Sequence, residues 1–418
     1  RTAQRRSIWQ APCIYVSRAA VQAAVPPRAG AQPFLHRSVQ LTSTYMLRRS
    51  VARQAPRSAR TILGIESSCD DSCASVVRSD RTVLSSVVVR QNHQDTQGIH
   101  PLHAARSHHQ HVPQAIAKAL DAARCNIQDI DGIGVTRGPG MPGCLAVGMT
   151  AAKALATVHG KPLVYVHHMR AHALTPLLTE PEPPSFPFLT LLVSGGHTML
   201  VLVHGLDAFQ ILANTLDDSV GNAFDKFARE LELGWQSASG ALVEALAAQH
   251  DPSQAVDKPY LPRILLGAPT FSYSGLRSAA MRQISIAGGA RTMSSKEKAA
   301  LAYDFQLAAF APLEDKIVRA LVPQRGRGWQ LANSCASIHP HEIRSVVCSG
   351  GVASNAFLRR RLRDALDSHG RHDVTLHFPP VSLCMDNAAM IAWAAHLYWH
   401  ERTHDLSPHV VAKWPLDV

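Results

Sequence analysis

The chain has 418 residues, of which 46% are hydrophobic and 17% charged, a composition typical of a globular protein and unlike that of a chain disordered throughout. Its formal net charge is +11, which on its own would suggest a protein that binds nucleic acid. No uninterrupted apolar run reaches the roughly 18 residues that a membrane-spanning helix needs, so we expect no membrane segment.

The basic excess lies in residues 1–60, which contain 11 Arg and no Lys, Asp or Glu. Of the 42 Lys and Arg in the chain, 31 remain after this segment, and they balance 31 Asp and Glu. A segment that is rich in Arg, Ser, Ala and Gln and free of acids is typical of a mitochondrial transit peptide, so we expect residues 1–60 to direct the protein to the mitochondrial matrix. A disordered basic arm that contacts nucleic acid is the alternative.

Two segments share one layout: a strand, a polar turn and a second strand. In residues 61–77 the turn holds two Ser and two Asp, including Asp70, and can present backbone amides and carboxylates to a phosphate, a cation or an amine. In residues 188–203 the turn is Ser-Gly-Gly at 194–196, where the missing side chains let a ligand approach the backbone. Residues 346–355 run from a third strand through another Gly-Gly pair into a helix, a suitable cradle for a nucleotide. The repetition predicts duplicated lobes that close on a nucleotide.

Residues 180–187 contain four Pro and predict the linker between the lobes. We therefore expect an N-terminal lobe at 61–187 and a C-terminal lobe at 188–418. Within the first lobe, residues 131–137 predict a strand, which a Gly/Pro turn connects to a helix at about 145–159.

A pair of histidines is the strongest candidate for a metal site. His168 and His172 are four residues apart on a predicted helix, so they lie on one face and can bind one ion. A His-Glu-x-x-His peptidase needs Glu directly after the first His, where Met169 stands, so the sequence disfavours that type of enzyme. A catalytic metal usually takes a third protein ligand, and Asp386, where a loop meets an apolar helical run, is the best candidate. Because the chain contains 23 His, a chance pair on a packed helix remains the alternative.

Four further segments carry weaker signals. Residues 217–226 predict a helix with acids at its start, and Asp225, a turn later, is placed to meet a ribose hydroxyl. Residues 271–278 predict an aromatic and basic turn suited to a stacked base or a phosphate. Residues 98–110 contain four His and predict a surface loop that enters a helix, whereas residues 324–342 predict an insertion without a motif.

Seven motifs occur in the order in which one protein family carries them. They are IESSCDD at 65–71, VHHMRAH at 166–172, LVSGGHT at 192–198, AFDK at 223–226, FSYSGL at 271–276, SGGVASN at 349–355 and MDNAAM at 385–390. Together they resemble the universal tRNA N6-adenosine threonylcarbamoyltransferases, in the mitochondrial branch, from about residue 62 to 416. Two segments depart from the family pattern: Leu102 and Ala105 replace a Glu and a Ser, and residues 235–241 replace a Tyr-Pro-Gly-Gly-Pro segment.

The resemblance implies an α/β fold with two lobes, the actin-like or sugar-kinase-like ATPase fold of duplicated ribonuclease-H-like lobes around a central cleft. It also implies transfer of the threonylcarbamoyl group from threonylcarbamoyl-AMP to N6 of adenosine 37 in tRNAs that read ANN codons, which forms t6A. A separate synthase is expected to supply the adenylate, and a homodimer is the expected form in mitochondria. Because the chain after residue 60 is neutral, tRNA must be met by local basic patches such as residues 359–361.

The resemblance also implies roles for individual residues. His168, His172 and Asp386 would hold one divalent metal ion per subunit, zinc or iron. The adenylate would be held by Leu192, Val193, Ser194, Gly195, Gly196, Asp225, Gly240 and Asn355. Asp70 would lie closest to the transferred group, as the catalytic residue that orients the amine or accepts its proton.

Three other classes of function stay open from the sequence alone. They are a metal-dependent peptidase, an actin-like small-molecule kinase and a non-catalytic nucleotide-binding scaffold. Mass spectrometry of the nucleoside at position 37 of mitochondrial tRNA after gene deletion separates the tRNA-modifying enzyme from these three.

Overall fold

A computed structural model of the chain describes residues 59–92, 99–234, 239–251, 253, 261–322 and 339–417. The predicted transit peptide, apart from its last two residues, lies outside this range, as does most of the predicted insertion at 324–342. None of the helices that the structure describes is long and apolar enough to cross a bilayer.

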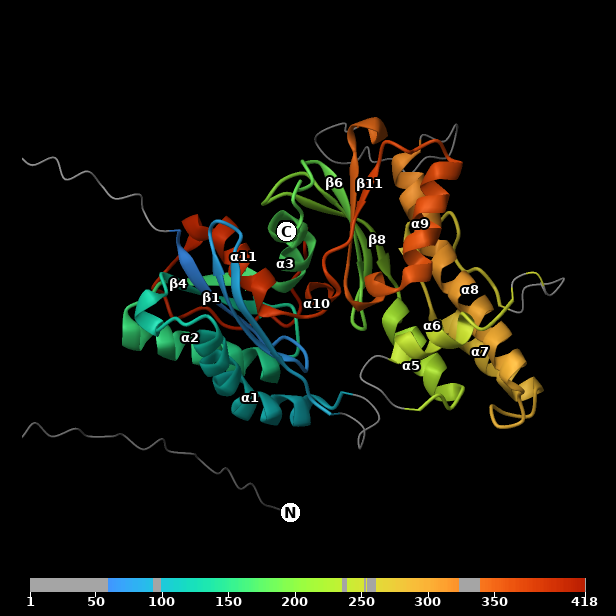
Figure 1. The fold of residues 1–418 in the computed structure, drawn as a ribbon, viewed down its shortest axis with the longest axis horizontal. Coiled ribbons are helices and arrows are strands. Elements are labelled where there is room, and N and C mark those ends of the chain that lie inside the picture. The colour runs from blue at the N-terminus through green and yellow to red at the C-terminus, as the bar shows by residue number, and fades with distance from the viewer. Residues whose placement is uncertain are drawn as a thin grey trace, which may run out of the picture. The chain divides into compact units, whose positions relative to one another are not determined.

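The first sheet has five strands in the order β3-β2-β1-β4-β5 (Figure 1). Its strands are β1 (Thr61–Glu66), β2 (Ser72–Arg78), β3 (Val83–Val89), β4 (Gly132–Gly138) and β5 (Leu163–His167). β1, β2 and β3 are antiparallel neighbours, whereas β4 pairs in parallel with β1 and with β5. Parallel pairs need crossover connections, and these contain α1 (Pro101–Ala122) and α2 (Pro142–His159). α2 begins three residues before the helix predicted at about 145–159.

The second sheet has six strands in the order β11-β10-β6-β7-β8-β9. Its strands are β6 (Phe188–Val193), β7 (Thr198–Val203), β8 (Phe209–Thr215), β9 (Thr270–Phe271), β10 (Ser345–Ser349) and β11 (Thr375–His377). β6, β7 and β8 are antiparallel neighbours, and β10 pairs in parallel with β6 and with β11. Apart from the extra β9, strand order and direction repeat those of the first sheet, which confirms the predicted duplication.

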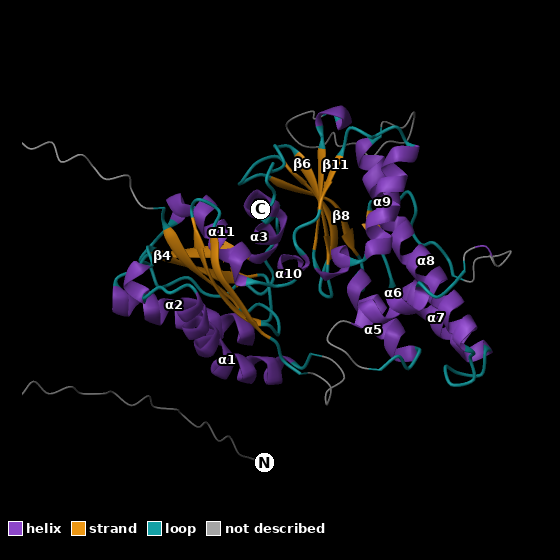
Figure 2. Ribbon diagram, viewed as in Figure 1, coloured by secondary structure: helices purple, strands orange, loops and turns teal. Residues whose placement is uncertain are grey.

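Together with α1 and α2, the remaining helices form three layers (Figure 2). They are α3 (His168–Leu174), α4 (Pro176–Thr179), α5 (Val220–Glu230), α6 (Ser239–Ala247), α7 (Ser274–Ile286), α8 (Ser295–Leu321), α9 (Ala356–Ser368), α10 (Val381–Cys384) and α11 (Ala388–Leu397), with 3-10 turns at Ile127–Asp129, Pro340–Glu342, Gly351–Ser354 and Trp399–Glu401. α1 and α2 pack on one face of the first sheet, and α5, α7, α8 and α9 share the core on one face of the second. α3 and α11 share a third core with residues of both sheets, so they lie between them.

Helix α11 lies in the predicted C-terminal lobe by sequence but packs on the sheet of the N-terminal lobe. Nine of its ten residues are buried, which requires walls on more than one side, and it packs on β1, β2 and β4 of the first sheet. Two glycines allow this close approach, because a Cβ on Gly64 would lie 2.2 Å from the carbonyl oxygen of Ala388 and one on Gly134 would lie 2.7 Å from Ala395 Cβ. The last part of the chain, predicted to belong to the lobe at 188–418, thus returns to the lobe at 61–187.

Candidate metal centre and nucleotide-binding turns

The two candidate histidine ligands stand on α3, directly after β5. The imidazole of His167 caps the helix, because its Nδ1 accepts hydrogen bonds from the backbone amides of Met169 and Arg170. Burial, together with nearby Arg170, lowers the pKa of His167 to about 3, so this ring stays neutral and able to accept. The cap places His168 at the first position of α3 and His172 one turn later, with ring centroids 4.7 Å apart.

Asp386 reaches the same place from the segment between α10 and α11. Its neighbour Asn387 caps α11 by accepting from the backbone amide of Met390 and donating to the carbonyl of Met385, which fixes the backbone on both sides. Asp386 Oδ1 lies 3.1 Å from His172 Nε2 and 3.5 Å from His168 Nε2. Donor atoms at about 2.1 Å from a tetrahedral ion are about 3.4 Å apart, so these separations suit one shared ion.

The chemistry of the three residues also fits a metal ion. Their donor atoms all lie within 4.8 Å of one another, and no second group of this kind occurs in the part of the chain that the structure describes. Burial alone would raise the pKa of Asp386, but His168 and His172 lower it below its usual range, so the carboxylate is ionised. Burial opposes a charge on His168, yet the carboxylates of Glu66 and Asp386 outweigh it and raise the pKa of that ring to about 9. The buried carboxylate of Glu66 and the partly exposed one of Asp386 thus favour a cation beside the two imidazoles.

The turn between β1 and β2, which carries Asp70, lies beside this centre. The Oγ atom of Ser68 is 3.3 Å from His168 Nδ1, and the thiol of Cys73 contacts the backbone oxygen of Asp386 at 3.6 Å. Asp70 is partly buried in the turn, and burial together with the charges of Asp70 and Asp386 raises the pKa of Asp71 to about 7. The structure thus brings Asp70 into the neighbourhood of the predicted metal ligands.

The turn at 194–196 is fastened to the start of α5. The backbone amide of Ser194 donates to the carbonyl of His197, and Ser219 Oγ donates to the carbonyl of Gly195. Gly195 and Gly196 are exposed, so their backbone is open to a ligand. By contrast, Leu192 and Val193 are buried in two different cores. Their side chains therefore cannot contact an adenylate, and these two residues can support the predicted site only as part of the strand that carries the turn.

The second Gly-Gly pair lies next to the first one. β10 pairs with β6 in register, with Ser349 opposite Leu192, so the two turns leave the same edge of the sheet. Gly350 has φ +100°, and a Cβ there would meet the carbonyl oxygen of Val193 at 2.2 Å. Ligands of open α/β sheets bind at the carboxyl ends of parallel strands, which is where both turns lie.

Three other predicted adenylate contacts gather around this edge. Asp225 on α5 accepts a hydrogen bond from the backbone amide of Gly240 on α6, although burial raises the pKa of Asp225 to about 6. Glu244, one turn after Gly240, accepts from the backbone amide of Ala356, the residue that follows Asn355. The side chain of Asn355 accepts from the backbone amide of Leu358, which caps α9, and donates to Gln306. Both of its polar atoms are thus used to hold the helix in place.

Residues 82–393 match the profile of the family described as TsaD, tRNA N6-adenosine threonylcarbamoyltransferase. The chain belongs to this family. It is 40% identical over 354 residues to the tRNA N6-adenosine threonylcarbamoyltransferase of Symbiobacterium thermophilum, covering 84% of this chain and 95% of that protein.

Two further comparisons support the family and the fold. The tRNA N6-adenosine threonylcarbamoyltransferase of Paracoccus denitrificans is 40% identical over 366 residues, covering 85% of this chain and 94% of the relative. HypF from T. kodakarensis has a TM-score of 0.52 at 12% identity, covering 82% of this chain and 48% of that chain, a likeness that concerns the fold alone. With its two repeated sheets, the chain has the two-lobed actin-like fold that was predicted.

Within this member of the threonylcarbamoyltransferase family, two weaker predictions need correction. The loop predicted at 98–110 does enter a helix, but among the described residues α1 begins already at Pro101. His108 is fully buried in that helix, with its ring hydrogen-bonded to Ser72 Oγ at 2.6 Å and to the carbonyl of Cys69 at 3.0 Å. The aromatic side chains of the turn at 271–278 cannot stack on a base, because both lie in the core. Asp217 holds that turn by accepting from Ser272, Tyr273 and Ser274.

Two of the three arginines in the predicted basic patch at 359–361 form contacts within the protein. Arg361 forms a two-pronged ion pair with Glu314, and Arg359 donates to the carbonyl of Ala353. Arg360 is exposed and keeps its predicted availability for tRNA.

Two functional neighbours were not predicted from the sequence. Glu66 is fully buried and bonds to His168, and His197 follows the first Gly-Gly turn, where burial and the nearby His168 lower its pKa to about 4. The signal for Glu66 was a single acid at the end of an apolar strand.

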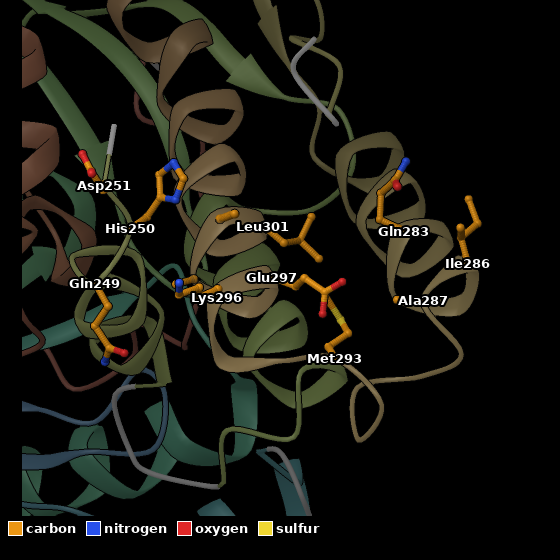
Figure 3. Close-up of a pocket in the computed structure, with 12 residues that line it drawn as sticks. Gln249, His250, Asp251, Gln283, Ile286, Ala287, Met293, Lys296, Glu297 and Leu301 are labelled. Carbon is orange, nitrogen blue, oxygen red and sulfur yellow. The ribbon is translucent and has the colours of Figure 1, made fainter. Parts of the chain in front are cut away.

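A cavity of about 490 Å³ lies elsewhere, where the ends of α6 and α7 meet the start of α8 (Figure 3). Its lining includes His250, Gln283, Lys296 and Glu297 but none of the predicted site residues. It is therefore separate from the metal centre and the turns.

Proposed function

We propose that this chain transfers the threonylcarbamoyl group from threonylcarbamoyl-AMP to N6 of adenosine 37 in tRNAs that read ANN codons. The observation that carries the proposal is the meeting of His172 and Asp386, 214 residues apart in sequence, beside the turn of Asp70. The family of the chain supports the reaction type, and the exposed backbone of the turn at 194–196 supports a nucleotide as the carrier of the group.

The reaction joins a weak nucleophile, the exocyclic amine of adenine, to a carbonyl that carries AMP as leaving group. His168, His172 and Asp386 would hold a divalent ion, which would supply the Lewis acidity that polarises the carbonyl and balances the charge of the leaving phosphate. The exposed backbone of Gly195 and Gly196 would hold AMP. When N6 bonds to the carbamoyl carbon, the bond from that carbon to the phosphate oxygen breaks and AMP leaves; Asp70 orients the amine or accepts the proton that N6 loses.

The direct test is a reconstituted reaction. Purified full-length protein, loaded with zinc or iron, receives threonylcarbamoyl-AMP and an unmodified tRNA transcript with adenosine at position 37. We expect t6A in the nucleoside digest by mass spectrometry, and none from a matched transcript with guanosine at that position. Equal labelling of both transcripts, or no product from the adenosine transcript with intact threonylcarbamoyl-AMP present, would contradict the proposed function.

The metal ion is proposed to be zinc or iron. Two imidazoles and one carboxylate with an open position occur in catalytic zinc sites and in non-haem iron sites, so the donor set suits either ion. Elemental analysis of protein purified without added metal distinguishes the two, and a content well below one ion per subunit would contradict the centre.

We also propose that the protein works in the mitochondrial matrix as a homodimer and that a separate synthase supplies its adenylate. The Arg-rich, acid-free composition of residues 1–60 supports import. A fusion of residues 1–60 to a fluorescent protein should enter mitochondria, whereas a fusion with the Arg residues replaced by Gln should stay outside. Loss of t6A from mitochondrial but not cytosolic tRNA after gene deletion is the expected companion result. Light scattering of the purified chain tests the dimer.

A further inference from the structure

Glu66 is a buried acid at the end of β1. Its side chain has no exposure to solvent, and the five residues before it in the strand carry no other charge. Removing a carboxylate from water is expensive, so a group in this position needs several donors. Glu66 has three: Oε1 accepts from the backbone amide of Ser68 at 2.5 Å, and Oε2 accepts from Thr136 Oγ1 at 2.5 Å and from His168 Nδ1 at 3.0 Å.

The two ring nitrogens of His168 face in opposite directions. Nδ1 faces Glu66, while Nε2 faces Asp386 at 3.5 Å and therefore the predicted ion. A neutral imidazole carries one proton, and the nitrogen that carries it cannot bind a metal. A carboxylate only accepts hydrogen bonds, so it stabilises the ring form with the proton on Nδ1.

We propose that Glu66 is a positioning residue of the metal centre, which holds the proton of His168 on Nδ1 and leaves Nε2 free to bind the ion. This role rests on the proposed metal centre and extends it. Through its other oxygen, Glu66 also holds the amide of Ser68, at the start of the turn that carries Asp70. One side chain therefore sets both the orientation of a ligand and the turn beside it.

The two histidine ligands differ in this support. His172 Nδ1 is buried and has no hydrogen-bond partner among the residues that the structure describes, whereas His168 Nδ1 has a carboxylate. We therefore expect Glu66 to orient the ring of His168, whereas the packing of α3 alone orients the ring of His172.

The test compares the zinc affinity of full-length variants, measured by competition with a chromophoric chelator. Glu66→Gln has nearly the same shape, but its amide can donate to Nδ1 and stabilise the ring form with the proton on Nε2, which blocks the ion. Loss of a carboxylate behind a metal-binding histidine lowers affinity about 10- to 100-fold, and we expect this loss here. Glu66→Asp keeps the charge and should recover part of the affinity.

Glu314→Gln is the matched control, because Glu314 is a nearly buried carboxylate whose partner is Arg361 rather than a metal ligand. We expect it to bind zinc like the wild type. Thermal midpoints of all variants are measured in the presence of chelator, so that loss of stability is separated from loss of affinity.

The outcomes separate the two proposals. If the wild type binds neither zinc nor ferrous iron, or if Asp386→Ala binds zinc as well as the wild type, the metal centre itself is wrong. If both behave as expected but Glu66→Gln matches the wild type, the role of Glu66 is wrong. Should Glu66→Gln not fold, a crystal structure of the zinc-loaded wild type decides: ligation through Nε2 with Nδ1 on Glu66 supports the role, and ligation through Nδ1 overturns it.

Discussion

Asp70 sits in a turn whose backbone is held on two sides, by Glu66 at the amide of Ser68 and by the amide of Met141, which donates to the carbonyl of Ser68. Because these neighbours hold the backbone, we expect the turn to survive replacement of the Asp70 side chain. The role of this residue can therefore be tested by a single substitution.

We predict that Asp70→Ala lowers the rate of transfer by about 10²- to 10⁴-fold, the range expected for loss of a general base, with AMP binding nearly unchanged. Single-turnover transfer and calorimetric titration with AMP measure the two effects. Asp80→Ala, an exposed acid beyond the end of β2, should alter neither. A variant of Asp70 that no longer binds AMP would show that the residue holds the nucleotide instead.

Gly350 shows how one residue controls the geometry of a whole edge. Its φ of +100° is unfavourable for any residue with a side chain, and a Cβ would lie 2.2 Å from the carbonyl oxygen of Val193. We predict that Gly350→Ala destabilises the protein by about 2–4 kcal/mol, measured by urea unfolding. Gly205→Ala, where nothing lies within 4 Å of the added Cβ, should change stability by less than about 0.5 kcal/mol. Equal effects of the two changes would contradict the close packing of the turn.

At the level of elements, α11 joins the first sheet through a histidine. His396 Nε2 contacts the carbonyl of Val77 at 3.0 Å, and Nδ1 accepts from Arg60 at 3.3 Å. Burial, with a smaller effect of Arg60, lowers the pKa of His396 to about 4, so the folded protein keeps this ring neutral. The contact therefore depends on pH.

We predict that His396 makes the protein less stable in acid. The unfolded chain binds the proton near pH 6.5 and the folded chain only near 4, so the stability from this group is complete above 6.5 and is lost as pH falls from 6.5 to 4. The loss is up to about 3 kcal/mol, from 1.36 kcal/mol for each unit of pKa difference. His396→Gln can keep both hydrogen bonds, so its unfolding free energy should fall less over this range, while exposed His400→Gln should follow the wild type. Parallel curves for all three would exclude this role for His396.

For the molecule as a whole, the metal centre joins α3 to the start of α11, and both helices pack between the two sheets. An ion that binds only the folded state adds stability as its concentration rises above the dissociation constant, by about 2.7 kcal/mol at 100-fold excess. The centre is thus a cross-link between distant parts of the chain.

We predict that removing the ion by chelation abolishes transfer and lowers the thermal midpoint, and that added zinc or iron restores both. Activity on ANN-reading tRNA and differential scanning calorimetry are the measurements. His172→Ala should already have the lower midpoint and should not respond to chelator. If chelator lowers the thermal midpoint of His172→Ala as much as that of the wild type, the stabilising ion binds at another site.

Local patterns in the sequence were enough to predict the strands, the turns and the pair of histidines. The turn at 194–196 was visible because a Gly-Gly pair between two apolar runs is typical of a tight turn, and His168 and His172 because helical spacing alone puts them on one face. The repeated layout of strand, turn and strand was enough to predict duplication. Motif order was enough for the family, which the comparisons confirmed.

Tertiary structure decided what no local pattern contains. Whether Asp386 reaches the histidines depends on how α11 returns to the first sheet, and that depends on Gly64 and Gly134 facing it across more than 250 residues of chain. Burial of Phe271, Tyr273 and His108 was equally hidden, because an aromatic or a histidine can face either solvent or core in the same local sequence. The role of Glu66 became visible only when its donors, which come from three separate segments, were placed around it. Spacing along the chain fixes which side chains share an element, whereas packing between elements fixes which of them meet.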